Sequence, residues 1–284
     1  MGRINMRILI LGASGYAGSC IKKALEKEYQ EVFGTYQNQM KAGQFSGDSS
    51  MYQYALGKQG ELEALLRKTD PDVVISCLRG DFGRQKEAHK ALGEFLAGKE
   101  NGSILYLSSA NVFDGDLRKP HLETDLPKAE SSYGQFKIAC EELLAGQLGE
   151  RAVILRIPEI WGTGCPRLKK FQKDVQQGRP VQTYGNFWVN YTTDQQIAAW
   201  VSYIMKQNLH GVFHIGTRDL YGYTAFQEEL AERLGVGTPV FEIEENQEKQ
   251  VLAVVPGRQE IPERLQIGVE DVLRLASGRE RWMV

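Results

Sequence analysis

The chain has 284 residues, of which 42% are hydrophobic and 25% are charged, and its formal net charge is −2. These values are typical of a soluble globular protein, and the lack of a long basic stretch argues against nucleic acid or an anionic membrane as a partner. The four cysteines are far apart and form no C-x-x-C pair, so neither a zinc site nor a disulfide framework is predicted.

No apolar run in the sequence reaches the ~20 residues that a helix needs to cross a bilayer. The amino terminus, "MGRINMRILILGASG", does not resemble a signal peptide, because its apolar run is short and leads straight into a glycine turn. We therefore expect a cytoplasmic protein without a metal centre, built as one large domain or as a large domain with a smaller lobe.

Strands and helices alternate along the first part of the chain. Short apolar runs predict strands at residues 7–11, 31–36, 73–77, 103–109 and 152–158. Amphipathic segments predict helices after Gly18, from about Glu61, at 84–98 and at 132–147. This alternation predicts an α/β fold of Rossmann type, a doubly wound parallel sheet with helices on both faces.

The later part of the chain is less regular. Three elements are predicted there: a helix at 192–207 with its N-cap near Thr193 or Asp194, a strand at 211–216, and a helix at 225–235. The pattern is weak between 162 and 190 and again after 236, so no element is predicted in these stretches.

The segment "GASGYAG" places Gly12, Gly15 and Gly18 between the first strand and the first helix. Glycine allows a tight turn and a close approach to a pyrophosphate, and the helix N-terminus offers N–H groups and partial positive charge to that anion. A plain strand-to-helix turn would explain the glycines without a ligand. The strand before them and the helix after them favour a dinucleotide site.

A dinucleotide site at this turn suggests that the first part of the chain binds the cofactor and the later part binds the substrate. We expect residues 1–160 to form the cofactor-binding Rossmann domain, with the strand near 211–216 returning to its sheet. Residues 161–284 would then mainly form a smaller C-terminal lobe that binds the substrate.

The end of the second strand indicates which nicotinamide cofactor is preferred. NAD sites usually carry Asp or Glu at that end, where the carboxylate holds the ribose 2′-hydroxyl. Here the acid, Glu31, stands at the start of the strand, while Thr35 and Tyr36 stand at its end and Lys41 lies beyond. No carboxylate would repel a 2′-phosphate, so NADP is expected, with NAD as the alternative.

Tyr133 precedes Lys137 by four residues in the segment "SSYGQFKIACEE". Four residues are about one helical turn, so the two side chains share a face. A neighbouring ammonium favours the phenolate and brings the phenol pKa down from ~10 toward the range of acid-base catalysis. On its own, such a pair is more often an incidental pair on a surface helix.

The glycine turn and the Tyr/Lys pair together resemble the extended short-chain dehydrogenase/reductase family. That family adds a serine or threonine just after the fifth strand, and "YLSSANVFDG" supplies Ser109 at that place. Within the family, the likeness is to the dTDP-4-dehydrorhamnose reductase branch. It rests on "ETDLPKAESSYGQFKIACEELL", "LRIPEIWG", "VNYTTDQQIA" and "GVFHIGT", and it extends to about Leu234.

The resemblance implies a reductase that transfers a hydride from NADPH to the ketone of a 4-keto sugar nucleotide. Tyr133 would donate the proton to the developing alkoxide. Lys137 would lower the pKa of Tyr133 and bind the nicotinamide ribose, and Ser109 would bind the carbonyl oxygen.

The resemblance also implies the residues that bind the two ligands. The cofactor would contact the three glycines, Tyr133 and Lys137, together with Ser14, Tyr16, Ala17, Thr35, Tyr36, Lys41, Cys77, Leu78, Arg79 and Ile157. The sugar nucleotide would contact Ser108, Asn111, Glu159, Trp161, Trp188 and Asn190.

The sequence departs from the branch at two positions beside the site. Ala110 replaces an aspartate, and Glu159 stands where the branch carries a tryptophan, with Trp161 nearby. Two other functions therefore stay open: a sugar-nucleotide epimerase or dehydratase with bound NAD, and an NADP-binding regulatory or sensor protein with little turnover. The sequence also leaves a homo-oligomer open.

Overall fold

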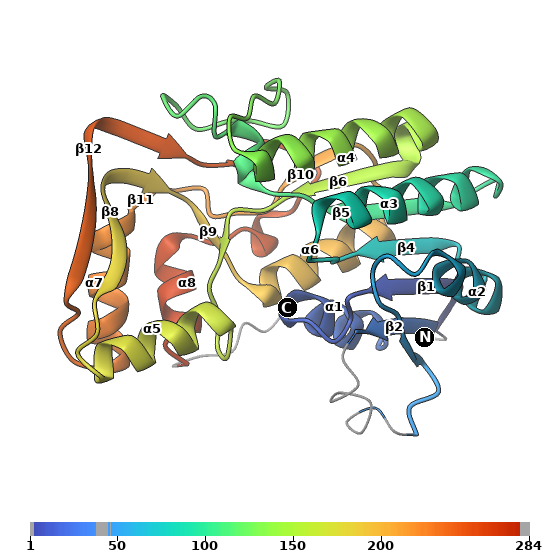
Figure 1. Cartoon of the computed structure of the whole chain (residues 1–284), viewed down its shortest axis with the longest axis horizontal. Helices are drawn as coiled ribbons and strands as arrows, with labels where there is room; N and C mark the ends of the chain where they lie inside the picture. Colours follow the sequence, from blue (N-terminus) through green and yellow to red (C-terminus); the bar gives the residue numbers. More distant parts are fainter. Residues whose placement is uncertain (1–2, 38–44, 46, 279–284) are drawn as a thin grey trace. The chain divides into compact units, whose positions relative to one another are not determined.

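The computed structural model describes residues 3–37, 45 and 47–278 (Figure 1). Contacts divide the chain into two compact units. The first unit comprises the residues up to Ser108, 135–155 and 201–212. The second unit comprises 109–134, 156–200 and the residues from Phe213 onward.

The expected cofactor-binding domain, 1–160 with the strand near 211–216, and the substrate lobe, mainly 161–284, stay predictions. The segment 109–134 groups with the second unit because its partners come from late in the chain. Val251 N donates to Leu117 O at 2.7 Å, and His121 forms a bridge with Val254. The chain therefore passes between the two units several times.

The first unit contains the sheet that the sequence predicts. Its strands are β1 (Ile4–Leu11), β2 (Tyr29–Tyr36), β3 (Met51–Gln53), β4 (Val73–Ser76), β5 (Ser103–Leu107) and β6 (Ala152–Arg156), and the sheet also includes β10 (Val212–His214), which continues into the second unit. They are ordered β10-β6-β5-β4-β1-β2-β3. The pairs from β6 to β3 are parallel, which confirms the doubly wound fold. The sequence did not predict β3, whose three residues are too few to show a pattern.

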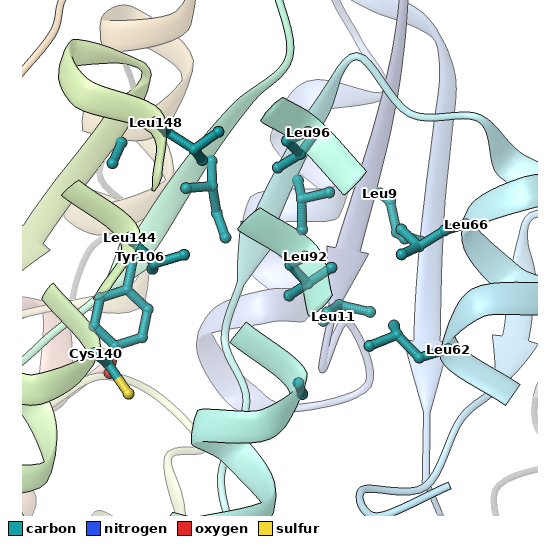
Figure 2. Packing of buried hydrophobic residues seen from close by; sticks show 14 of the residues in the cluster. Leu9, Leu11, Leu62, Leu66, Leu92, Leu96, Tyr106, Cys140, Leu144 and Leu148 are labelled. Carbon is teal, nitrogen blue, oxygen red and sulfur yellow. The ribbon is translucent and has the colours of Figure 1, made fainter. Parts of the chain in front are cut away.

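The helices that connect these strands along the chain cover the sheet. They are α1 (Tyr16–Leu25), α2 (Gln59–Thr69), α3 (Phe82–Ala97) and α4 (Ser132–Leu148). Helices α3 and α4 run side by side, and Gln147 Nε2 donates to Lys90 O at 3.2 Å (Figure 1). Figure 2 shows how leucines of β1, α2 and α3 pack together, with Tyr106 beside Cys140 and Leu144 of α4. This apolar layer fixes α4 against β5, and both elements carry predicted catalytic residues at or just beyond their ends.

The second unit is built from two small sheets and several helices. Its strands are β7 (Glu159–Ile160), β8 (Val181–Val189), β9 (Tyr191–Thr192), β11 (Tyr221–Gly222) and β12 (Phe241–Leu252). Strand β8 lies between β11 and β12, and β7 pairs with β9. Its helices are α5 (Pro166–Gln176), α7 (Tyr223–Leu234) and α8 (Val269–Ala276), and α6 (Asp194–Lys206) begins in this unit and ends in the first.

Helix α6 begins where the sequence predicts, since Thr193 Oγ1 accepts a hydrogen bond from Gln196 N at 3.0 Å. Other elements of the second unit were not predicted. Strand β12, "FEIEENQEKQVL", is exposed at seven of its twelve residues and rich in charge, so it has no clear apolar alternation. None of the described helices is long and apolar enough to cross a membrane.

Candidate active site

The glycine turn between β1 and α1 depends on two of its three glycines for its shape. Gly12 has a φ of +82°, and a Cβ there would lie 2.8 Å from Cys77 O. A Cβ on Gly18 would lie 2.4 Å from Gly12 O. Gly15 is exposed at the tip of the turn, where a Cβ would meet only Gly12 O, at 3.1 Å. The turn therefore needs Gly12 and Gly18 to fold, and Gly15 leaves its outer side open.

Thr35 of β2 is hydrogen-bonded to this turn. Its Oγ1 accepts a hydrogen bond from Gly12 N at 2.8 Å, and its carbonyl oxygen accepts one from Ser14 N at 3.1 Å. Thr35 is buried, so the predicted cofactor residue acts in the structure as a brace for the turn. The N-cap of α1 is Gly15, which has no side chain, so no side-chain cap occupies the N-terminus of this helix.

The described end of β2 carries no acid. Glu31 stands at the start of the strand, 3.7 Å from Arg7 Nε, and Tyr36 ends the strand with its ring stacked on Phe45 at 5.4 Å. The predicted cation Lys41 lies outside the described residues.

The remaining predicted cofactor residues fall at strand ends and in α1. Tyr16 and Ala17 begin α1 and are half-buried, and Ile157 is buried just after β6. Cys77 and Leu78 follow β4 and are half-buried, whereas Arg79 is exposed. Burial raises the pKa of the Cys77 thiol to about 12, so this thiol is not a nucleophile at neutral pH.

Lys137 is buried in the first unit, with only 5% of its surface exposed. Its Nζ donates to the carbonyl oxygen of Leu107, the last residue of β5, at 2.8 Å, and lies 4.6 Å from the ring centroid of Tyr106. Burial lowers the pKa of Lys137 to about 8, although the nearby Cys140 and Glu141 favour its charge. The ammonium is thus fixed at the carboxyl end of β5.

Ser108 and Glu141 form a second bond between β5 and α4. The Ser108 hydroxyl donates to Glu141 Oε1, and both residues are buried. Glu141 lies one helical turn beyond Lys137, so the pair fixes the same stretch of α4. Because the Ser108 hydroxyl is used in this way, its role as a substrate ligand stays a prediction.

Ser109 lies in the second unit, where it begins the short 3₁₀ helix η3 (Ala110–Phe113). Its Oγ accepts from Asn111 N at 3.2 Å and donates to Asn111 Oδ1 at 3.0 Å. Ala110 N donates to Ile157 O at 2.9 Å, so the loop after β5 is tied to the segment after β6. Ser109 therefore has a fixed backbone and a hydroxyl hydrogen that can turn from Asn111 to a ligand.

The start of α4 is held against this same loop within the second unit. Asp114 Oδ1 accepts from Glu130 N at 2.7 Å and from Ser131 N at 3.1 Å. Ser131 Oγ accepts from Gly134 N at 3.0 Å, as an N-cap does. A Cβ on Gly134 would lie 2.2 Å from Asn111 O, so only glycine allows this close packing.

Within the second unit, these contacts bring Tyr133 close to the loop of Ser109. Tyr133 lies between Ser131 and Gly134, in the turn that packs on the Ser109 loop, and 38% of its surface is exposed. Lys137 lies one turn further along α4. Asp114, Ser131 and Gly134 were not predicted from the sequence as residues that position this turn. The Gly that follows Tyr133 was the one available signal, since glycine is unfavourable in a helix.

Two of the predicted substrate residues make their contacts with other residues of the second unit. Asn190 is fully buried, its Nδ2 donates to Thr217 O and Val254 O, and its Oδ1 accepts from Val254 N. Trp188 of β8 is half-buried, with Lys249 Nζ 4.4 Å from its ring centroid. Contacts of either residue with substrate stay predictions.

Glu159 and Trp161 lie in a charged cluster that the sequence did not predict. Glu159 forms an ion pair with Arg167 and accepts from Trp161 Nε1 at 3.2 Å and from Tyr223 OH at 3.4 Å. Burial and the carboxylate of Glu159 raise the pKa of Tyr223, which stays a neutral phenol. Arg167 and Tyr223 come from two helices that are distant in sequence, so no local spacing could reveal them.

Among the residues that the structure describes, no group of three or more His, Cys, Asp or Glu side chains could hold a metal ion. His89, beside Cys140, illustrates the role of the histidines. Its Nε2 lies 2.8 Å from Ser76 Oγ, and burial followed by the charge of Lys137 lowers its pKa to about 3.

Comparison with known proteins gives both a family and a fold. The model of the family described as RmlD substrate binding domain matches residues 82–259, more than half of the chain. A curated relative, the probable low-salt glycan biosynthesis reductase Agl14 of Haloferax volcanii, is 20% identical over 81% of this chain and 81% of its own length.

Two solved structures share the fold of the chain. Bordetella bronchiseptica WbmH, solved in complex with NAD+, has a TM-score of 0.79 at 15% identity, with 98% of this chain and 100% of that one covered. The dTDP-4-dehydrorhamnose reductase of Bacillus anthracis, solved in complex with NADP, has a TM-score of 0.73 at 15% identity, with coverage of 95% and 98%.

Proposed function

The chain belongs to the RmlD substrate-binding-domain family, and on that premise we propose that it is an NADPH-dependent reductase of a 4-keto sugar nucleotide. The observation that carries the proposal is that two successive turns of α4 are each held by a different contact. Its first turn, with Tyr133, packs on the loop of Ser109, and its second turn, with Lys137, is bonded to the end of β5. Reductase names among the relatives, such as that from Haloferax volcanii, agree with it.

The glycine turn fits a dinucleotide. The exposed tip at Gly15 allows close approach, and α1 begins there without a side-chain cap, as a pyrophosphate site requires. NADP is preferred because the described end of β2 carries no acid that would repel a 2′-phosphate, and NAD remains the second cofactor. One of the solved neighbours holds NADP and another holds NAD+.

In the proposed reaction, bound NADPH supplies a hydride to the ketone carbon. The Ser109 hydroxyl, held at its oxygen by Asn111 N, donates a hydrogen bond to the carbonyl oxygen. Tyr133 donates its proton to that oxygen as negative charge develops there, and its partial exposure allows the phenolate to recover a proton from solvent. Lys137 binds the ribose of the cofactor and stabilises the phenolate of Tyr133.

The test of this proposal is Tyr133→Phe, which removes one hydroxyl and keeps the ring. With NADPH oxidation measured over a panel of nucleotide 4-keto sugars, turnover should fall by roughly 10²–10⁴-fold while NADPH affinity changes little. Tyr52→Phe, in β3, is the matched control and should keep full turnover. Near-normal reduction by Tyr133→Phe would refute the mechanism, and NADPH binding by a parent protein that reduces no keto-sugar would favour a regulatory role.

A further inference from the structure

The second unit contains an ion pair that the proposed mechanism does not use. Glu159 begins β7, and its carboxylate pairs with Arg167 near the start of α5. Trp161 donates its indole N–H to the same carboxylate, and its ring centroid lies 5.5 Å from the guanidinium carbon of Arg167. Both charged groups are therefore held in fixed orientations by a buried tryptophan.

The pair remains accessible although its surroundings are packed. The side chain of Glu159 is 24% exposed and that of Arg167 is 45% exposed. The bond from Tyr223 OH to Glu159 Oε1 is long, at 3.4 Å, so that oxygen can accept a better donor. A guanidinium has five N–H donors, and its exposed side can donate to a ligand. A ligand hydroxyl, which both donates and accepts, matches this pair.

A buried phenol faces the same cluster. Tyr191 is directly opposite Glu159 in the β7–β9 pair, and it is fully buried. Its hydroxyl has no hydrogen-bond partner among the described residues. A buried hydroxyl left in this state is unfavourable. The cluster therefore holds more polar groups than the described side chains satisfy, as expected of a site that is completed by a polar ligand.

The cluster also lies close to the loop of Ser109. Ile157 O accepts from Ala110 N at 2.9 Å, and Glu159 follows Ile157 by two residues. Two residues of extended chain span about 7 Å, comparable to the width of a hexose. A sugar whose carbonyl oxygen is held by Ser109 thus places a substituent within reach of Glu159.

We infer that Glu159 and Arg167 bind the hydroxyl group on C6 of the sugar, so that the substrate is a 4-keto hexose that keeps this group rather than a 6-deoxy sugar. The inference rests on the proposed function. On one flank of a C4 ketone, C3 carries a hydroxyl in both kinds of sugar. On the other flank, C5 carries a hydroxymethyl group in a hexose and a methyl group in a 6-deoxy sugar. A methyl group would remove water from the charged pair without replacing its hydrogen bonds.

The experiment compares two substrates that differ only in the 6-hydroxyl, on the same nucleotide, with NADPH oxidation as the readout. The kcat/KM for the 6-hydroxy substrate should exceed that for the 6-deoxy substrate by about tenfold or more. In the double variant Glu159→Gln with Arg167→Met, the ratio should fall to within about twofold. Lys173→Met, also in α5, is the matched control and should keep the parent ratio.

The outcomes separate this inference from the function on which it rests. Reduction of both substrates by the parent protein, with the 6-deoxy sugar equal or better, would overturn the inference and leave the proposed function standing. Reduction of neither would overturn the proposed function and the inference with it. If the double variant does not fold, the parent ratio still decides, and Arg167→Lys, which keeps charge but loses the planar fork, should lower that ratio.

Discussion

Two cations, one in each unit, are held in opposite ways. Lys137 is buried and donates to a backbone carbonyl oxygen, and its pKa falls to about 8. Arg167 is partly exposed and pairs with a carboxylate. Burial opposes its charge, but Glu159 raises its pKa above the usual value.

The contrast separates a cation that takes part in the proposed reaction from a cation that is proposed to recognise the substrate. A cation whose burial is incompletely compensated is unstable until another anion arrives, such as a phenolate beside it. A guanidinium locked to a carboxylate is permanently charged and has a fixed direction, which suits the selection of a hydroxyl group. The two cations should therefore respond differently to removal.

The largest expected effect is on turnover. Lys137→Met should lower turnover by roughly 10²–10⁴-fold, because Tyr133 loses the charge that favours its phenolate. It should also weaken NADPH binding, since the ribose loses its ligand. Arg167→Met should keep NADPH affinity and lower kcat/KM mainly for the hydroxylated substrate. Equal losses of cofactor affinity in the two variants would contradict the distinction between the two cations.

The second effect is on the free energy of unfolding, which the two variants should change in opposite directions. Below pH 8 the buried Lys137 is charged at a net cost on the order of 3 kcal/mol, relative to a lysine in the unfolded chain. Lys137→Met should therefore raise the free energy of unfolding at pH 7 by about 1–2 kcal/mol. Arg167→Met leaves Glu159 without its cation, so it should lower that free energy.

The pH dependence supplies the check on this reasoning. Between pH 8 and the unfolded value of Lys137, 10.5, the unfolded chain binds more protons than the folded chain, so parent stability should rise with pH in that window. The advantage of Lys137→Met should shrink over the same window in urea titrations. A constant difference from pH 7 to pH 10.5 would show that Lys137 is not charged at a cost in the fold.

A third effect concerns the pyrophosphate of the cofactor, which neither cation is proposed to bind. The pyrophosphate is assigned to backbone N–H groups at the glycine turn, so Gly15→Val should place a side chain where phosphate must approach. NADPH affinity should fall by more than about tenfold, ~1.4 kcal/mol. Thermal stability should change much less than in Gly18→Ala, whose Cβ would lie 2.4 Å from Gly12 O. Normal NADPH binding by Gly15→Val would refute the placement.

The sequence could predict the first cation site because its signals are local. Gly12, Gly15 and Gly18 recur at fixed spacing between a strand and a helix, and Tyr133 and Lys137 are one helical turn apart. What it could not predict was the attachment of α4. The carboxylate of Asp114 caps residues sixteen and seventeen positions later, a contact set by how the loop folds back rather than by any period.

The second cation site was harder to predict for the same reason. Glu159, Arg167 and Tyr223 meet across a strand and two helices, and the pairing of β7 with β9 joins segments that share no local pattern. Charged residues in exposed turns are common, so the sequence around Arg167 does not by itself indicate a binding site. Its role depends on Trp161, whose burial becomes clear only in the fold.

The smallest expected effect tests whether Glu141 moderates the charge of Lys137. Glu141→Gln keeps a side chain that can still bond the Ser108 hydroxyl, so α4 should stay in place and stability should change by less than about 1 kcal/mol. The carboxylate of Glu141 favours the charged form of Lys137, so its loss should lower the pKa of Lys137 further. Because catalysis needs the ammonium, the alkaline limb of the kcat profile should move to lower pH, by about one unit or less, with little change at pH 6. Glu141→Ala, which loses the bond as well as the charge, should lower turnover at every pH. An unchanged limb in Glu141→Gln would mean that Glu141 only fixes α4 to β5, and that the burial of Lys137 alone sets its pKa.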